Sequence, residues 1–180
     1  MNPAPNLVLI GPTGAGKTSL GRRAAERFGL AFVDLDQAIA ERAGASVKAI
    51  FEHAGEAGFR QHESAALRDA LAGDGQLVST GAGAILDAGN RALMRERAFV
   101  VHLQVGVEAQ IDRLARCANR PLLQQPDRDP VLREMARVRN PLYAETADLA
   151  LPTDGLAPAE ATARLIRLLA RHWQRCESPA

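Results

Sequence analysis

The sequence predicts an α/β fold in which a parallel sheet is covered by helices on both faces. Three observations carry this prediction. Short apolar runs alternate with segments of helical spacing along all 180 residues. A glycine-rich loop follows the first apolar run and favours a phosphate site at the carboxyl end of the sheet. No repeat, linker or shift in composition divides the chain, so we expect a single domain over residues 1–180.

The first apolar run, residues 7–10, leads directly into a complete G-x-x-x-x-G-K-[ST] phosphate-binding loop, Gly11-Pro12-Thr13-Gly14-Ala15-Gly16-Lys17-Thr18. Residues 19–28 then place apolar side chains at helical spacing. In this context the loop amides and the helix N-terminus are expected to surround a phosphate group. We expect Lys17 to reach the β- and γ-phosphates of ATP and the Thr18 hydroxyl to bind Mg²⁺. The predicted ATP-binding residues of the loop are Gly14, Ala15, Gly16, Lys17, Thr18 and Ser19.

The other elements follow from apolar spacing, glycine breaks and capping residues. We expect further strands at residues 31–33, 76–79, 98–103 and 149–151. We expect helices at residues 37–42, 47–53, 56–71, 90–96, 107–117 and 131–139, and a last helix that begins at Pro158 and has Ala161, Leu165, Leu168 and Trp173 on one face. Residues 118–130 form a loop that is long for a compact domain and typical of a lid over an active site.

Composition and charge restrict the class of function. The formal net charge is +1, which argues against nucleic acid as the main partner. Only Lys17 and Lys48 are lysines among the 22 basic residues, so we expect arginine to recognise a small anionic substrate. Cys117 and Cys176 are far apart and the histidines have no ligand spacing, so we expect reduced thiols and no zinc site. No signal peptide or membrane span is visible, so we expect a cytoplasmic protein with no membrane partner.

Two carboxylates, Asp34 and Asp36, end the second predicted strand. Alternate side chains of a strand share a face, so both are expected to point toward the ligand at the carboxyl end of the sheet. We expect Asp34 beside Mg²⁺ with Thr18, and Asp36 beside the acceptor hydroxyl. The alternative is that an aspartate here only caps the next helix. No aspartate ends the third strand, at residues 77–80, which tells against motor ATPases and favours a small-molecule kinase.

Four more segments follow in order: Gly55-Glu56-Ala57-Gly58-Phe59-Arg60-x-x-Glu63, Ser79-Thr80-Gly81-Ala82-Gly83-Ala84, Arg120-Pro121-Leu122-Leu123 and Arg139-Asn140-Pro141-Leu142-Tyr143. With the phosphate loop and Asp34-Leu35-Asp36, they make the chain resemble the shikimate kinase family from about residue 6 to residue 170. The resemblance implies a P-loop NTPase, nucleoside-monophosphate-kinase-like three-layer fold with a five-stranded parallel sheet. It also implies transfer of the ATP γ-phosphoryl group to the 3-hydroxyl of shikimate, on the route to chorismate and aromatic amino acids.

The resemblance implies a role for each matching residue. Asp36, Lys17 and Arg120 would be catalytic, with Asp36 at the acceptor hydroxyl and Arg120 reaching the phosphates from the lid at residues 118–130. Arg113 and Pro158 would sandwich the adenine. The substrate-binding residues would be Asp36, Arg60, Arg139 and Glu63, with the two arginines on the shikimate carboxylate, together with the backbone amides of Gly81, Ala82 and Gly83.

Ala82 departs from the family pattern, which has a glycine triplet here. We expect Ala82 to have negative φ, to turn its methyl away from shikimate and still to donate its amide. Without the resemblance, Arg60 would read as a helix charge paired with Glu56 or Glu63, and Arg139 as a partner of Glu145.

Two other functions remain open at this point: another small-molecule kinase of the gluconate type, and a non-catalytic ligand-sensing module of a transcription regulator. The second would carry a fused helix-turn-helix region, and the chain begins only five residues before its first strand. Intact Lys17, Asp34 and Asp36 also favour an enzyme. We expect a monomer whose partners are ATP and shikimate, with Mg²⁺ as cofactor.

Overall fold

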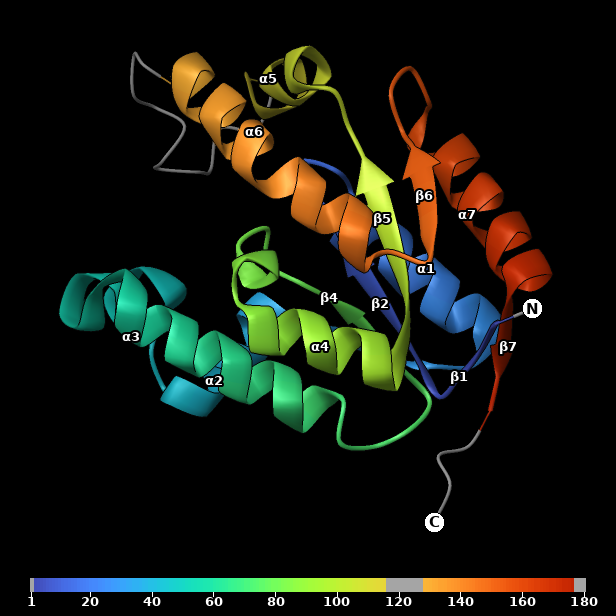
Figure 1. Ribbon diagram of the computed structural model, residues 1–180, viewed down its shortest axis with the longest axis horizontal. Helices are drawn as coiled ribbons and strands as arrows, with labels where there is room; N and C mark the ends of the chain where they lie inside the picture. The colour runs from blue at the N-terminus through green and yellow to red at the C-terminus, as the bar shows by residue number, and fades with distance from the viewer. Residues whose placement is uncertain (1, 116–127, 177–180) are drawn as a thin grey trace.

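The computed structural model describes residues 2–115 and 128–176, and its centre is a parallel sheet of five strands (Figure 1). The strand order is β3-β4-β2-β5-β6, and every neighbouring pair is parallel. This arrangement confirms the predicted sheet. The strands are β2 (Asn6–Ile10), β3 (Ala31–Asp34), β4 (Gln76–Ser79), β5 (Ala98–Gln104) and β6 (Leu149–Pro152).

Helices cover both faces of this sheet, which confirms the three-layer fold. They are α1 (Lys17–Phe28), α2 (Leu35–Ala43), α3 (Val47–Ala70), α4 (Ala88–Arg97), α5 (Val107–Ala115), α6 (Arg128–Thr146) and α7 (Pro158–His172), with a short 3₁₀ helix η1 (Ala84–Leu86). In the described part of the chain, none of these helices has the length and apolar character needed to cross a membrane.

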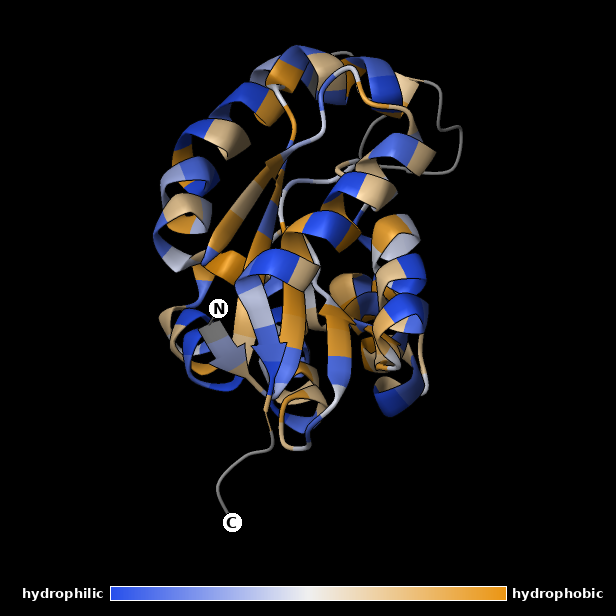
Figure 2. Cartoon of the chain, turned by 90° about the vertical axis from the view of Figure 1, so that its right-hand side faces the viewer, coloured by the Kyte–Doolittle hydropathy of each residue, from blue (hydrophilic) through white to orange (hydrophobic). Residues whose placement is uncertain are grey.

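The alternation of side chains along β2 explains the two cores. Leu7 and Leu9 point to one face and pack with α1 and α7, whereas Val8 and Ile10 point to the other face and pack with α2, α3, α4 and α6. All four side chains are at most 1% exposed. Figure 2 shows the result, with hydrophobic strands between helices of mixed polarity. A sheet buried on both faces explains why its strands read as continuous apolar runs.

The structure contains a second sheet that the sequence analysis did not predict. Strand β1 (Asn2–Ala4) pairs in parallel with β7 (Trp173–Arg175). The prediction that Trp173 lies on the last helix is wrong, because α7 ends at His172. The indole Nε1 of Trp173 donates a hydrogen bond to the Ala4 carbonyl (3.1 Å), and its ring meets Phe28 edge-on at 5.7 Å between centroids. These contacts are available to Trp173 only in the strand β7, so the helix ends one residue before it.

Helix α3 runs across two predicted helices, and its backbone leaves helical geometry at Gly55 (φ 65°, ψ −173°), so the predicted break between residues 47–53 and 56–71 is confirmed. Helix α6 is much longer than residues 131–139, because it begins at Arg128 and continues past Pro141 to Thr146. The buried side chain of Tyr143 packs this last part against the core that contains Val8 and Ile10. Residues 128–130 of the predicted lid therefore belong to α6, and residues 118–127 lie outside the described part of the chain.

Candidate active site

A pocket of about 290 Å³ opens at the carboxyl ends of β2, β3 and β4. It brings together the three segments that the sequence analysis singled out: the phosphate loop, the aspartate pair and the glycine-rich loop after β4. The pocket is lined by Thr13, Gly14, Gly16, Lys17, Thr18, Ser19, Asp34, Asp36, Ser79, Thr80, Gly81 and Ala82.

The phosphate loop is held in place by its own lysine and by its glycines. A Cβ at Gly11 would lie 2.5 Å from the Leu103 carbonyl oxygen, so the loop passes too close to β5 for any side chain at this position. Lys17 is the first residue of α1 and is 9% exposed. Its Nζ donates hydrogen bonds to the carbonyls of Gly11 (2.8 Å) and Pro12 (2.9 Å). The loop therefore presents a largely desolvated cation at the mouth of a helix N-terminus, an arrangement that attracts phosphate.

Asp34 joins the phosphate loop to α2. Its Oδ2 accepts a hydrogen bond from Thr18 Oγ1 (2.8 Å), and its Oδ1 accepts from the amides of Asp36 (3.2 Å) and Gln37 (3.4 Å). Asp34 therefore caps the helix, as the structural alternative held, and also faces the pocket. A hydroxyl and a carboxylate oxygen side by side are ligands that Mg²⁺ accepts.

The reason given for placing both aspartates on one side is wrong. Asp34 is the last residue of β3, but Asp36 already lies in the first turn of α2, so the alternation of a strand does not apply to the pair. Both carboxylates nevertheless line the same pocket, because a helix that begins at Leu35 turns its first residues over the end of the sheet.

Arg60 and Glu63 form a largely buried ion pair on α3. Nη1 of Arg60 donates to Oε2 of Glu63 (2.6 Å), and Nη2 donates to Oε1 of Glu56 (3.2 Å). The pairing within the helix that served as the alternative for Arg60 is therefore present. The side chain of Glu63 is only 1% exposed. Burial raises the pKa of its carboxyl above the usual range, while the charges of Arg60 and Arg139 act in the opposite direction.

The loop after β4 packs its backbone directly on these side chains. A Cβ at Gly81 would lie 2.9 Å from Oε1 of Glu63 and 3.1 Å from Oδ1 of Asp36. A Cβ at Gly83 would overlap the guanidinium group of Arg60. A side chain at either glycine would have to displace these charged groups, so Asp36, Glu63 and Arg60 all meet at this loop. No described residue other than glycine has a positive φ, so the prediction of negative φ for Ala82 is confirmed.

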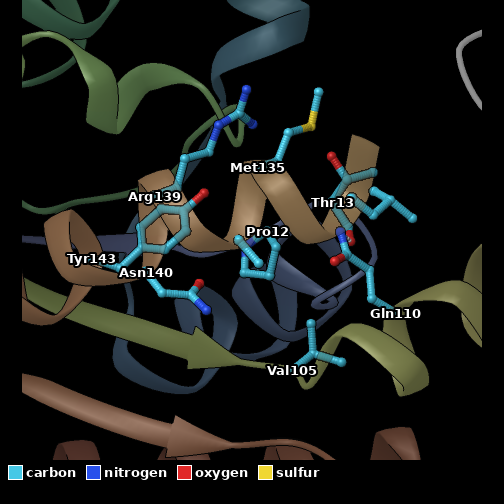
Figure 3. Close-up of a pocket in the computed structure, with 10 residues that line it drawn as sticks. Pro12, Thr13, Val105, Gln110, Met135, Arg139, Asn140 and Tyr143 are labelled. Atoms are coloured by element: carbon cyan, nitrogen blue, oxygen red, sulfur yellow. Dashed lines mark hydrogen bonds between the residues drawn. The ribbon is translucent and has the colours of Figure 1, made fainter. Parts of the chain in front are cut away.

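Arg139 lies on α6 and lines a second, smaller hollow beside the phosphate loop (Figure 3). This hollow also contacts Pro12, Thr13 and Tyr143. The alternative that Arg139 pairs with Glu145 is wrong, because Glu145 faces Arg95 across 3.7 Å. The charge of Arg139 instead acts against the rise in the pKa of Glu63, the carboxylate that pairs with Arg60.

The predicted adenine-binding residues do not line the main pocket. The guanidinium of Arg113 donates to the carbonyls of Gly14 (3.3 Å) and Thr153 (2.6 Å) and to the Thr153 hydroxyl (3.1 Å). It thereby ties the phosphate loop to the segment after β6. Pro158 is the exposed first residue of α7. Arg120 lies outside the described residues.

Sequence reasoning missed two buried polar residues behind the site. Gln110 of α5 is 4% exposed, and its side-chain amide donates to the Thr13 carbonyl (2.9 Å). His102 of β5 is also 4% exposed, and neither ring nitrogen has a hydrogen-bond partner among the described residues. Burial and the charge of Lys17 lower the pKa of His102 from 6.5 to about 4, so its ring is neutral at pH 7. A lone Gln or His in a sequence carries no signal for such a position.

Comparison with known proteins places this geometry in a family. The family model "Shikimate kinase" matches residues 13–170. A shikimate kinase from Xanthomonas campestris pv. campestris (strain 8004) is 64% identical over 180 residues, which covers 100% of both chains. One from Stenotrophomonas maltophilia (strain K279a) is 63% identical over 97% of both chains. A solved structure of the Acinetobacter baumannii enzyme in complex with shikimate superposes with a TM-score of 0.86 at 39% identity, over 93% of this chain and 94% of that chain.

Proposed function

The chain belongs to the shikimate kinase family, and from this premise we propose how its pocket carries out the reaction. The chain is an ATP-dependent small-molecule kinase that transfers the γ-phosphoryl group of ATP to the 3-hydroxyl of shikimate and yields shikimate 3-phosphate and ADP. The observation that supports our assignment of the pocket is the convergence of Lys17, Asp36 and Gly81 on one cavity, with Arg60 packed against the same loop.

ATP is proposed to bind with its phosphates in the loop from Gly14 to Ser19. Phosphoryl transfer needs little covalent help from the protein, and its rate depends on positioning and charge stabilisation. Lys17 Nζ lies on the loop carbonyls at 2.8 and 2.9 Å, and we expect it to turn from them to the phosphate oxygens when ATP binds. Arg113 and Pro158 are proposed to flank the adenine, and Arg120 to reach the phosphates from the lid.

Mg²⁺ is proposed to bind at Thr18 and Asp34, whose side chains are 2.8 Å apart. The described residues contain no group of three or more His, Cys, Asp or Glu side chains that would hold a metal alone. This agrees with the way Mg²⁺ binds in kinases, through one or two protein oxygens and the substrate phosphates. When bound, the ion would neutralise charge on the phosphate oxygens.

Shikimate is proposed to bind between α3, α6 and the loop from Gly81 to Gly83. Its carboxylate requires cationic forks, which Arg60 and Arg139 supply, and bidentate contacts of this kind fix orientation as well as position. Glu63 keeps the guanidinium of Arg60 in place at 2.6 Å. Asp36 would then accept a hydrogen bond from the 3-hydroxyl and orient it toward the γ-phosphate.

A single domain, a monomeric state and a cytoplasmic location complete the proposal. One large core lies on each face of the main sheet, and the small sheet of β1 and β7 joins the first of them through Ala4 and Trp173. The two other functions considered for the sequence, a gluconate-type kinase and a non-catalytic sensor, give different results in the assay below.

The test is a coupled assay with ATP and Mg²⁺ in which shikimate, gluconate and nucleoside monophosphates are compared as acceptors. We expect turnover with shikimate as acceptor and none with gluconate or the nucleoside monophosphates. Asp36→Asn should lower kcat by about 10²-fold or more while ATP still binds, and Lys17→Met should be at least as damaging. Asp87→Asn is the matched control, because Asp87 caps α4 through the Asn90 amide (2.8 Å) away from the pocket. Wild-type single-turnover rates in either site variant would refute the assignment.

A further inference from the structure

Tyr143 makes a buried contact between α6 and the glycine-rich loop that the reaction as described leaves unused. Its side chain is 1% exposed, and its hydroxyl donates a hydrogen bond to the carbonyl of Ala82 (2.6 Å). The two residues are 61 positions apart in sequence, so the bond joins two elements that no local structure connects. Figure 3 shows Tyr143 and Arg139 on the same stretch of α6, beside the phosphate loop.

The bond to Ala82 fixes more than one atom. The peptide unit that contains the Ala82 carbonyl also contains the amide of Gly83, and a trans peptide is planar, so its C=O and N–H point in opposite directions. No described peptide bond is cis. A hydroxyl that holds the Ala82 oxygen therefore also sets the direction of the Gly83 N–H, one of the amides proposed to meet shikimate.

The ring of Tyr143 packs against the ring of His102. The two ring centroids are 4.8 Å apart with planes tilted by 32°. His102 belongs to β5 and pairs in register with Ile10, the last residue before the phosphate loop. The imidazole ring therefore packs against the phenol ring from the central sheet, so the ring of Tyr143 lies against a strand and not against a loop.

Arg139 is one helical turn before Tyr143 on the same face of α6, where side chains at i and i+4 are neighbours. Both side chains line the hollow beside the phosphate loop. The tyrosine thus lies beside a proposed ligand of the shikimate carboxylate and is hydrogen-bonded to the loop that carries the proposed amide ligands. The distance between these two sets of ligands must match the size of the acceptor.

We propose that Tyr143 is a positioning residue for the acceptor: through the Ala82 carbonyl it fixes the direction of the Gly83 amide, and with it this end of the glycine-rich loop, relative to Arg139. The inference rests on the proposed function, since it assumes that these groups bind shikimate. Tyr143 does not touch the reacting atoms, and its effect is on acceptor binding rather than on the nucleotide.

Tyr143→Phe removes only the hydroxyl and keeps the ring on His102. We expect KM for shikimate to rise by about tenfold, as for the loss of one hydrogen bond, while KM for ATP changes by less than about twofold. Thr146→Val is the matched control. Thr146 is 2% exposed and its hydroxyl donates to the Leu142 carbonyl (2.7 Å) on the same helix, so the variant loses a similar bond that does not reach the loop.

A merely structural role would lower Tm in both variants and leave KM for shikimate unchanged in both. That result would overturn the inference, and so would an equal rise in the two KM values of Tyr143→Phe. If wild-type protein turns over no shikimate at all, the proposed function itself fails. If wild type is active, Asp36→Asn is inactive and Tyr143→Phe behaves as Thr146→Val, only the present inference fails.

A second measurement does not depend on the variant. Tyr143 is the only tyrosine in the chain. Uniform incorporation of 3-fluorotyrosine therefore labels this position alone, and ¹⁹F NMR reports on it in the full-length protein. We expect the resonance to shift in a saturable manner on addition of shikimate and to change little with ADP alone. A resonance that shikimate at saturation leaves in place would overturn the inference.

Discussion

Gly83→Ala puts a methyl group where the guanidinium of Arg60 lies. A Cβ at this position would overlap Nη1, Nη2 and Cζ of Arg60. The backbone of Gly83 has φ −95° and ψ −11°, which an alanine adopts without strain. The substitution therefore acts on Arg60 and not on the conformation of the loop, and we expect the guanidinium to move away from both Gly83 and Glu63.

The size of the effect follows from what Arg60 loses. A hydrogen bond between charged groups contributes about 1.5–3 kcal/mol, which is about a 10- to 150-fold change in kcat/KM when the contact is to the substrate. The side chain of Arg60 is 24% exposed, so solvent weakens the contact and the lower part of that range applies. We expect kcat/KM for shikimate to fall by about 10- to 30-fold. Stability should fall as well, because Glu63 is left buried without its partner.

Steady-state kinetics with shikimate varied at saturating ATP measures the effect, and titration calorimetry follows nucleotide affinity, which should not change. Gly73→Ala is the control, because Gly73 lies in an exposed turn where an added Cβ would meet only Nε2 of Gln76 at 3.5 Å. If kcat/KM of Gly83→Ala stays within about twofold of this control, Arg60 does not bind the acceptor and the reasoning is refuted.

Three further changes test other parts of the site. Arg139→Ala should cost about 2–5 kcal/mol in kcat/KM for shikimate with ATP affinity unchanged, and wild-type shikimate binding in calorimetry would contradict this. The folded-state pKa of His102 is lowered from 6.5 to about 4, so the unfolded chain binds a proton first as pH falls. The free energy of unfolding should therefore fall by about 3 kcal/mol between pH 6.5 and pH 4. Urea unfolding of wild type and of His102→Phe across this range measures the loss, and curves of unfolding free energy against pH that run parallel for the two proteins would contradict it. Ala82→Gly should change kcat/KM by less than about threefold.

The main sheet was predictable because both of its faces are buried. Each strand is then an apolar run, and the turns between runs carry glycine or polar residues, so the strands can be located along the chain, although their order in the sheet (β3-β4-β2-β5-β6) does not follow the sequence. The small sheet of β1 and β7 has no such pattern. Its strands have three residues each, and Trp173 fits the helical spacing of α7 until its indole meets Ala4, which is 169 positions away in sequence. A contact at that separation leaves no local signal.

The same division holds at the site. The phosphate loop was predictable because its function lies in local backbone conformation, which glycine spacing dictates. The geometry of Asp34 and Asp36 was not predictable in the same way. Asp34 begins helix α2 by accepting hydrogen bonds from two backbone amides, so Asp36 lies in the helix and not on the strand. Gln110 and Tyr143 reach across the fold to single carbonyl oxygens. A backbone carbonyl is available at every residue, so sequence gives no reason to choose one.

Ala82 shows how the structure decides a question that the sequence leaves open. A glycine triplet can mean that its middle residue needs positive φ or that a side chain would crowd the ligand, and Ala82 adopts negative φ, so the first reason does not apply. Its carbonyl is already held by Tyr143 at 2.6 Å, so Ala82→Gly leaves the direction of the following Gly83 amide fixed.

Only the methyl group remains as a difference between alanine and glycine at this position. Ala82 lines the pocket, so removing its methyl group in Ala82→Gly tests whether that methyl obstructs shikimate. We expect a change below about 0.7 kcal/mol in transition-state binding, with a loss of up to about 1 kcal/mol in stability from the freer unfolded chain. A gain of about tenfold or more in kcat/KM would instead show that the natural alanine impairs the enzyme.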